Sequence, residues 1–188
     1  MPAQSAAYPP DGQRKGGYGG AVKARKLSLC ALMTALALVL SYLESLLQLS
    51  FLIPVPGLKL GLSNLVTLTV LVLYGLPYAL PVAFAKCFLG AFFANGPMSF
   101  WFSFTGALCA IFVMWVLLRY GKRVVSLWGV SMAGAAMHNL GQILAAAVSM
   151  QTAAVFGYLP VLLLASIVTG TVIAAAAAPM VRALSKTT

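Results

Sequence analysis

The chain has 188 residues, of which 62% are hydrophobic and only 7% are charged, and its mean hydropathy is +0.98. A soluble domain carries about 25% charged residues, so the charges here cannot cover a surface that faces water. The composition excludes an ordinary soluble domain and predicts an integral membrane protein in contact with the lipid bilayer.

The net charge of +10 comes from twelve basic residues against two acidic ones, Asp11 and Glu44. The basic residues fall mainly at the ends of apolar runs, which is the pattern of membrane topology signals. Nucleic-acid binding would need a basic stripe on a solvated face, so we expect no nucleic-acid partner. The three cysteines lie singly inside apolar runs and are interpreted as small apolar fillers.

The predicted organisation is a tail followed by one membrane domain. Residues 1–22 are rich in Gly, Pro, Ser and Gln, which predicts a disordered cytoplasmic tail rather than a signal peptide. Residues 23–188 are predicted to form a single all-α transmembrane domain, a polytopic bundle of about six helices. The apolar runs place these helices at about 27–49, 62–76, 78–94, 99–119, 127–149 and 157–182. The break between the second and third is weak, so a single bent hairpin element is an alternative there.

Basic residues are concentrated on alternate connections between the predicted helices. One group precedes the first helix, a second separates the fourth from the fifth, and a third follows the sixth, whereas the other connections contain only Lys59. Lys and Arg mark the cytoplasmic side of a membrane protein. The pattern therefore predicts a multi-pass protein of the cytoplasmic membrane, with both termini in the cytoplasm.

Small residues line one face of the first predicted helix. Ser28, Ala31 and Ala35 are spaced by three and four residues, which puts them on the same side. Small faces allow helices in lipid to approach closely. The residues themselves leave two interpretations open, a contact inside the chain and a docking face for a partner subunit.

Two lysines need explaining because charges inside a bilayer are costly and often mark function. Lys59 lies in "PVPGLKLGLSNL", just before a helix that begins at Asn64, and helix N-termini favour anions. A snorkelling lysine at the interface is the alternative for Lys59. Lys86 lies midway along the third predicted helix, too deep to snorkel easily, and is predicted to face a cavity.

Three more polar residues interrupt the apolar run "VSMAGAAMHNLGQILAAAVSM". His138 and Gln142 are four apart and share a helical face, which Asn139 borders. Under the predicted topology the polar residues gather in the outer half of the membrane, which suggests a pocket open to the outer side. The predicted substrate-binding residues are Lys59, Asn64, Lys86, Asn95, Ser103, His138, Asn139 and Gln142.

The sequence gives little support for catalysis. We predict no catalytic residue, no cofactor and no metal site, because nothing completes a set of metal ligands around His138 and acids are scarce. A nucleotide-binding loop of the form GxxxxGK[ST] is absent from the sequence. If the protein moves a substrate across the membrane, the energy would therefore come from a partner or a gradient. Whether the protein is an enzyme is left open, with a non-catalytic role favoured.

Three segments, "PGLKLGLSNLVTL", "GVSMAGAAMHNLGQ" and "YLPVLLLASIVTG", resemble the Gx transporter family, which is also labelled heptaprenyl diphosphate synthase component I. The resemblance covers about residues 25–183, and Lys86 stands where the family usually has Arg. That family is similar to the substrate-binding S components of energy-coupling factor transporters. The resemblance implies six helices, a small-molecule pocket open to the outer side, and docking of Ala31 and Ala35 on a transmembrane coupling subunit with its ATPases.

The synthase label implies a second function. Prenyl chain elongation uses aspartate-rich motifs to hold magnesium and diphosphate, and this chain has a single aspartate. The alternative is therefore a non-catalytic membrane accessory component of heptaprenyl diphosphate or quinone metabolism, or of membrane electron transfer, whose ligand would be lipid-like. The leading prediction is a membrane subunit that binds or translocates a small molecule.

Overall fold

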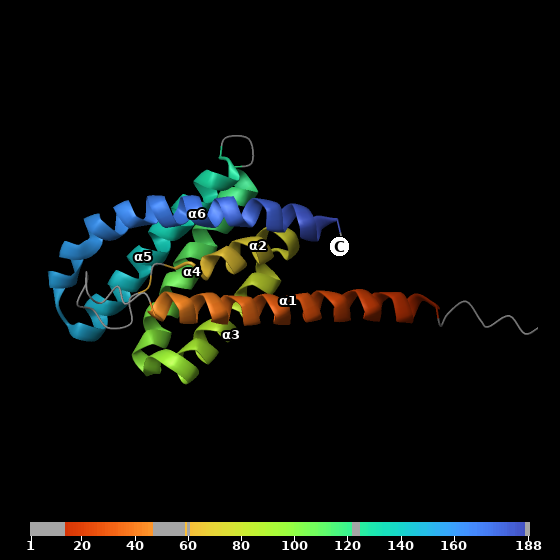
Figure 1. Cartoon of the computed structure of the whole chain (residues 1–188), viewed down its shortest axis with the longest axis horizontal. Coiled ribbons are helices and arrows are strands. Elements are labelled where there is room, and N and C mark those ends of the chain that lie inside the picture. The colour runs from red at the N-terminus through yellow and green to blue at the C-terminus, as the bar shows by residue number, and fades with distance from the viewer. Residues whose placement is uncertain (1–13, 47–58, 60, 122–124, 187–188) are drawn as a thin grey trace, which may run out of the picture.

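The computed structural model describes residues 14–46, 59, 61–121 and 125–186, and all its regular elements are helices. This part of the chain contains no strand, so the predicted all-α helical bundle is confirmed (Figure 1). The elements are α1 (Arg14–Leu46), α2 (Asn64–Tyr74), α3 (Leu76–Gly90), the π-helix η2 (Ala91–Asn95), α4 (Gly96–Tyr120), α5 (Leu127–Met150), the 3-10 helix η3 (Ala153–Tyr158) and α6 (Leu159–Ser185).

Four helical segments of the described chain are long and apolar enough to cross a membrane, which supports the membrane assignment. They are Lys23–Glu44, Leu76–Phe93, Gly96–Tyr120 and Ala153–Ser185. Helix α5 has 24 residues, a sufficient length, but carries the polar residues at its centre. Helix α2 has 11 residues and is about 16 Å long, about half the thickness of a bilayer core. Helix α2 therefore cannot span the membrane by itself.

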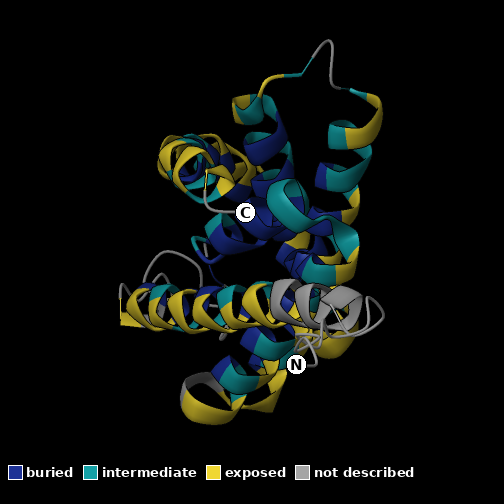
Figure 2. Cartoon of the chain, turned by 90° about the vertical axis from the view of Figure 1, so that its right-hand side faces the viewer, coloured by how far each residue is buried: buried dark blue, intermediate teal, exposed yellow. Residues whose placement is uncertain are grey.

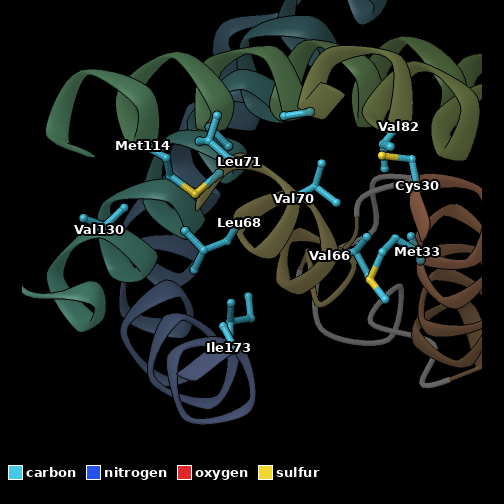
Figure 3. Packing of buried hydrophobic residues seen from close by; sticks show 14 residues of the cluster. Cys30, Met33, Val66, Leu68, Val70, Leu71, Val82, Met114, Val130 and Ile173 are labelled. Carbon is cyan, nitrogen blue, oxygen red and sulfur yellow. The ribbon is translucent and has the colours of Figure 1, made fainter. Parts of the chain in front are cut away.

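The short helix α2 occupies the middle of the bundle, between α1 and α6 (Figure 1). Its side chains pack in opposite directions: Leu68 lies near Ile173 of α6, and Val66 lies near Met33 of α1 (Figure 3). Val66, Leu68 and Val70 are fully buried. Neighbours cover most of α2, which suits its mainly apolar sequence, and its N-terminus is held inside the protein.

A genuine turn separates α2 from α3, so these are two elements rather than one bent hairpin arm. Gly75 has φ 78° and ψ −174°, a backbone conformation that residues with a side chain rarely adopt. Its N–H donates to the carbonyl of Leu71 at 3.0 Å, and Pro77 lies in the first turn of α3. A glycine that ends one helix and a proline that begins the next are typical of a tight helix connection.

Helix α1 begins earlier than the sequence predicts. Residues 14–22, which were predicted to belong to a disordered tail, continue the helix of the apolar segment, and this end projects beyond the other helices (Figure 1). Extending an existing helix costs much less than nucleating one, so a preceding glycine-rich stretch can join it. The rest of the predicted tail, residues 1–13, lies outside the described residues.

The small face of α1 is not covered by the rest of the described chain. Ser28, Ala31 and Ala35 are exposed, whereas Met33 and Ala37 on the opposite side are buried. Figure 2 shows the same division along α1, with exposed residues on its outward side. This excludes a contact of the small face with another described helix.

Helices α4 and α5 cross at very short range, and this crossing positions His138. A methyl group added to Gly141 would lie 2.8 Å from Cα of Gly106, and one added to Gly106 would lie 2.7 Å from the carbonyl oxygen of His138. The two glycines therefore allow the backbones to touch. The consequence is that His138 and Gln142 of α5 lie directly against Gly106 of α4.

Candidate functional site

A small polar cavity lies where α1, α3, α4 and α5 meet the segment that leads into α2. We call it the polar cavity; it is lined by Ser41, Lys59, Gly61, Ser63, Lys86, Cys87, Gly90, Ala91, Ser99, Ser103 and His138. Its volume, measured by where the centre of a water molecule can lie, is about 10 Å³. This is the space of about one water molecule, so the cavity admits a small chemical group rather than a whole metabolite.

Lys86 reaches the cavity from α3 and is bound by oxygen atoms at the N-terminus of α2. Its Nζ lies 3.0 Å from Thr67 Oγ1, 3.2 Å from Ser63 Oγ, 3.3 Å from the Ser63 carbonyl and 3.5 Å from Asn64 Oδ1. The side chain is only 4% exposed. These acceptors are uncharged, so the ammonium is solvated by the protein while its charge is not neutralised.

Lys59 enters the same cavity from the segment before α2. Its Nζ donates to Ser41 Oγ at 2.8 Å, and its backbone N–H donates to Gln142 Oε1 at 3.4 Å. Burial lowers the pKa of the Lys59 ammonium, and the nearby carboxylate of Glu44 opposes part of that change. Ser41 and Gln142 thus hold this lysine between α1 and α5.

Glu44 is the one acidic residue in the described part of the chain, and the backbone takes one of its oxygens. Its Oε1 accepts a hydrogen bond from the Gly61 N–H, while Oε2 is buried without a hydrogen-bond partner. Neither Lys59 nor Lys86 forms a salt bridge with any residue that the structure describes. Glu44 therefore offsets the positive charge of the region without pairing directly with either lysine.

His138 and Gln142 form a hydrogen-bonded pair behind the cavity. Because Gln142 Oε1 accepts from the Lys59 N–H, the amide nitrogen Nε2 of Gln142 faces His138 Nε2 at 3.1 Å. An amide N–H can only donate, so His138 Nε2 is the acceptor, the ring is neutral, and its proton is assigned to Nδ1. The imidazole is thus oriented by Gln142 and lies against Gly61 and Gly106.

Three side-chain donors at this site have no partner within the described chain. They are Asn64 Nδ2, Ser103 Oγ and the protonated Nδ1 of His138, all buried. A buried donor without an acceptor costs about 1–3 kcal/mol, so such groups call for a ligand or a water molecule. Two ammonium groups and spare donors together favour an anionic group such as a carboxylate or phosphate. No cluster of three metal-ligating side chains occurs among these described residues.

The structure brings most of the predicted binding residues together. Lys59, Lys86, Ser103 and His138 line the cavity, Asn64 contacts Lys86, and Gln142 lies one step behind.

Two predicted residues, Asn139 and Asn95, need separate treatment. Asn139 is turned toward α6, where its Nδ2 donates to the Leu162 carbonyl at 2.9 Å, because successive residues of a helix point about 100° apart. Asn95 is in η2, and its side chain lies outside the described part of the structure.

Several polar residues at the site were not predicted from the sequence. Ser41, Ser63, Ser99 and Thr67 are hydroxyl residues within or beside apolar helices, and the sequence identifies Glu44 only as one of two acidic residues. Serine and threonine are common in membrane helices, where they bond to their own backbone. Their spacing therefore carried no signal that distinguished a binding role.

A comparison with protein families gives a match. The model of the family described as heptaprenyl diphosphate synthase component I matches residues 33–180, which include every described residue that lines the polar cavity. Neither the curated proteins nor the solved structures contain a match to this chain.

Proposed function

The chain belongs to the heptaprenyl diphosphate synthase component I family, and from this premise we propose that it is a membrane subunit that binds an anionic small molecule through the polar cavity. One observation carries the proposal: two buried ammonium groups converge on one cavity and neither forms a salt bridge with a described residue. Retaining uncompensated charge in a membrane protein is costly, so a ligand that restores its balance is the simplest physical reason for it.

The transport form of this proposal rests on the exposed face of α1. Ala31 and Ala35 are uncovered within the described chain, as a docking face for a transmembrane coupling subunit requires. The N-terminal end of α1 and the C-terminal end of α6 lie at the same end of the molecule, which suits two cytoplasmic termini (Figure 1). Replacing Ala35 with tryptophan should abolish co-purification of ATPase-bearing subunits while ligand binding is kept. Unchanged co-purification would remove the transport form.

A second candidate function follows from the name of the family. The chain would then be an accessory membrane subunit of prenyl diphosphate synthesis that holds a lipid-like ligand for a soluble enzyme. Its own residues favour a non-catalytic part, because Glu44 is the one acid in the described region and is bound to the backbone of Gly61. Co-purification of a prenyl synthase in place of ATPases would favour this function.

Thermal unfolding in the presence of cellular anions tests the central proposal. The full chain in nanodiscs is mixed with the fraction of a cell extract that binds an anion-exchange column and is eluted with salt. A ligand that binds only the folded state raises Tm by mass action. We expect Tm of the natural protein to rise, and the rise to be lost in Lys59→Met.

A matched control separates ligand binding from a general effect of charge. Lys23→Met makes the same chemical change at an exposed position of α1, far along the helix from Ser41. Its Tm should rise as much as that of the natural protein. An equal rise in all three proteins would show that the anion binds elsewhere and would overturn the proposal.

A further inference from the structure

The polar cavity adjoins an apolar groove on the outside of the bundle. The groove, which we call the aromatic groove, is lined by Phe84, Phe88, Ala91, Phe92, Phe93, Gly96, Pro97, Phe100 and Trp101. Ala91 lines both the groove and the cavity. It begins the π-helix η2 and follows Gly90, which also lines the cavity, so both residues at this point have small or no side chains. Single π-helical turns recur at functional sites.

The two spaces differ in size and chemistry. The aromatic groove has a volume of about 690 Å³ by the same measure that gives about 10 Å³ for the polar cavity. Sites for organic ligands commonly have about 300–1,000 Å³. Phe84 stacks on Phe88 and meets Phe100 edge-on, which builds a continuous aromatic wall. A ligand that filled both spaces would have a small polar head and a large apolar body.

The charges near the polar cavity restrict the head group further. Lys59 and Lys86 contribute two positive charges and Glu44 contributes one negative charge, whereas His138 is neutral because its Nε2 accepts from Gln142. The balance is a single positive charge. One negative charge on the ligand would neutralise it, and a carboxylate is the smaller of the two anionic groups, carboxylate and phosphate, that the donors favour.

We propose that the ligand is a monoanionic amphiphile, a long-chain carboxylate that enters from the bilayer and places its head in the polar cavity and its chain in the aromatic groove. This rests on the proposed function and specifies its substrate class. The occupant of the groove is inferred from the cationic cavity beside it, with which it shares Ala91. An uncharged lipid would leave the net positive charge of Lys59, Lys86 and Glu44 without a counter-charge. Access is from the lipid side, past Ala91, rather than from water.

Binding of radiolabelled palmitate to the full chain in nanodiscs tests this inference. Butyrate provides the head without the chain, and hexadecanol provides the chain without the charge. We expect palmitate to bind at least about tenfold more tightly than either, because each lacks one half of the contact. Lys59→Met and Ala91→Leu should each weaken palmitate binding by about tenfold or more, the first by removing charge and the second by filling the junction.

The control is Ala175→Leu, the same change on an exposed position of α6, which should bind palmitate normally. The inference would be overturned if hexadecanol bound as tightly as palmitate, or if Lys59→Met and Ala91→Leu bound palmitate normally. Either result would show that the groove only contacts bilayer lipid without specificity. Butyrate binding as tightly as palmitate and lost in Lys59→Met would overturn only the apolar half and leave the proposed function standing. Tighter binding of a lipid that has the same hydrocarbon chain but a diphosphate head would contradict the inference that the ligand carries a single negative charge.

Discussion

At the scale of single residues, the two lysines of the site differ in role: one holds two helices together and the other is available to a ligand. Lys86 is held by Ser63, Asn64 and Thr67, and it joins α3 to the N-terminus of α2. Among the described residues, Lys59 Nζ has one side-chain partner, Ser41, which leaves donor capacity for a ligand. Lys59 is therefore the residue whose removal tests binding, whereas removal of Lys86 also disturbs the packing of two helices.

Ser103 offers a substitution that separates binding from folding. Its hydroxyl is buried without a hydrogen-bond partner among the described residues, so Ser103→Ala should leave the free energy of unfolding within about 0.5 kcal/mol of the natural value or raise it. Ligand affinity should fall about threefold to tenfold, the usual loss of one hydrogen bond. Parallel thermal unfolding and ligand titration measure both effects.

The matched control for Ser103 is Ser131, whose Oγ donates to the Gly170 carbonyl at 2.7 Å between α5 and α6. Ser131→Ala should lower the free energy of unfolding by about 1 kcal/mol and leave affinity unchanged. Equal effects of the two changes on affinity would remove Ser103 from the site.

The charge of Lys59 predicts opposite effects of pH on folding and on binding. Burial lowers the Lys59 pKa in the folded protein, whereas in the unfolded chain the value is about 10.4. Between these two values the folded state binds fewer protons, so stability without ligand should rise with pH. Anion affinity should fall over the same range because the neutral amine attracts no anion.

Titrations of affinity and Tm from neutral to alkaline pH measure both slopes. Lys59→Arg keeps its charge throughout this range and should flatten both of them. A natural protein whose affinity is independent of pH up to the usual lysine range would show that Lys59 does not bind the anion.

At the scale of helices, the apolar runs predict where the six helices lie, and the structure shows which of them are long enough to cross a bilayer. The run at 62–76 was read as a span, but the turn at Gly75 and the start at Asn64 leave α2 too short to cross a bilayer. Periodicity could not show this, because a helix buried on all sides and a helix in lipid are equally apolar. The contact partners of Lys86 likewise depend on where α2 is placed, which the sequence does not reveal.

The crossing of α4 and α5 gives a prediction on stability. A methyl group at position 141 would meet the backbone of Gly106 and Thr105, which cannot move aside, whereas one at position 134 would meet the flexible side chain of Met114. Gly141→Ala should therefore lower the free energy of unfolding by about 1–3 kcal/mol and also displace His138. Gly134→Ala should cost less. Thermal unfolding of both variants measures the difference, and a larger cost for Gly134→Ala would contradict this packing.

At the scale of the whole molecule, the position of the basic residues predicts the orientation in the membrane. We expect both termini and the segment that joins α4 to α5 to face the cytoplasm, and the segment around η3 to face outward. Green fluorescent protein fused after residue 188 should fluoresce, and alkaline phosphatase inserted near residue 152 should be active. Active phosphatase at the C-terminus would reverse the orientation and place the polar cavity near the opposite side.

The arrangement of the whole molecule also explains what the sequence could and could not predict about the site. The depth of Lys86, His138 and Gln142 along their helices suggests that they converge; in the structure Lys86 and His138 line one cavity, and Gln142 lies 3.1 Å from His138 Nε2. Glu44, Ser41 and Ser99 come from other helices, and only the packing of α1, α3 and α4 brings them near Lys59. Their contribution depends on tertiary contacts rather than on a motif. The sequence does not predict the groove beside Ala91 either, because its phenylalanines are equally compatible with a helix face in contact with lipid.

The most direct measurement is native mass spectrometry of the full chain taken gently from its own membrane, with Lys59→Met and Lys23→Met prepared side by side. A bound anion on the natural protein and on Lys23→Met, absent from Lys59→Met, is the predicted result, and its mass would identify the ligand. The same bound species on all three proteins, or none on the natural protein, would contradict an anion-binding role for the cavity around Lys59 and Lys86.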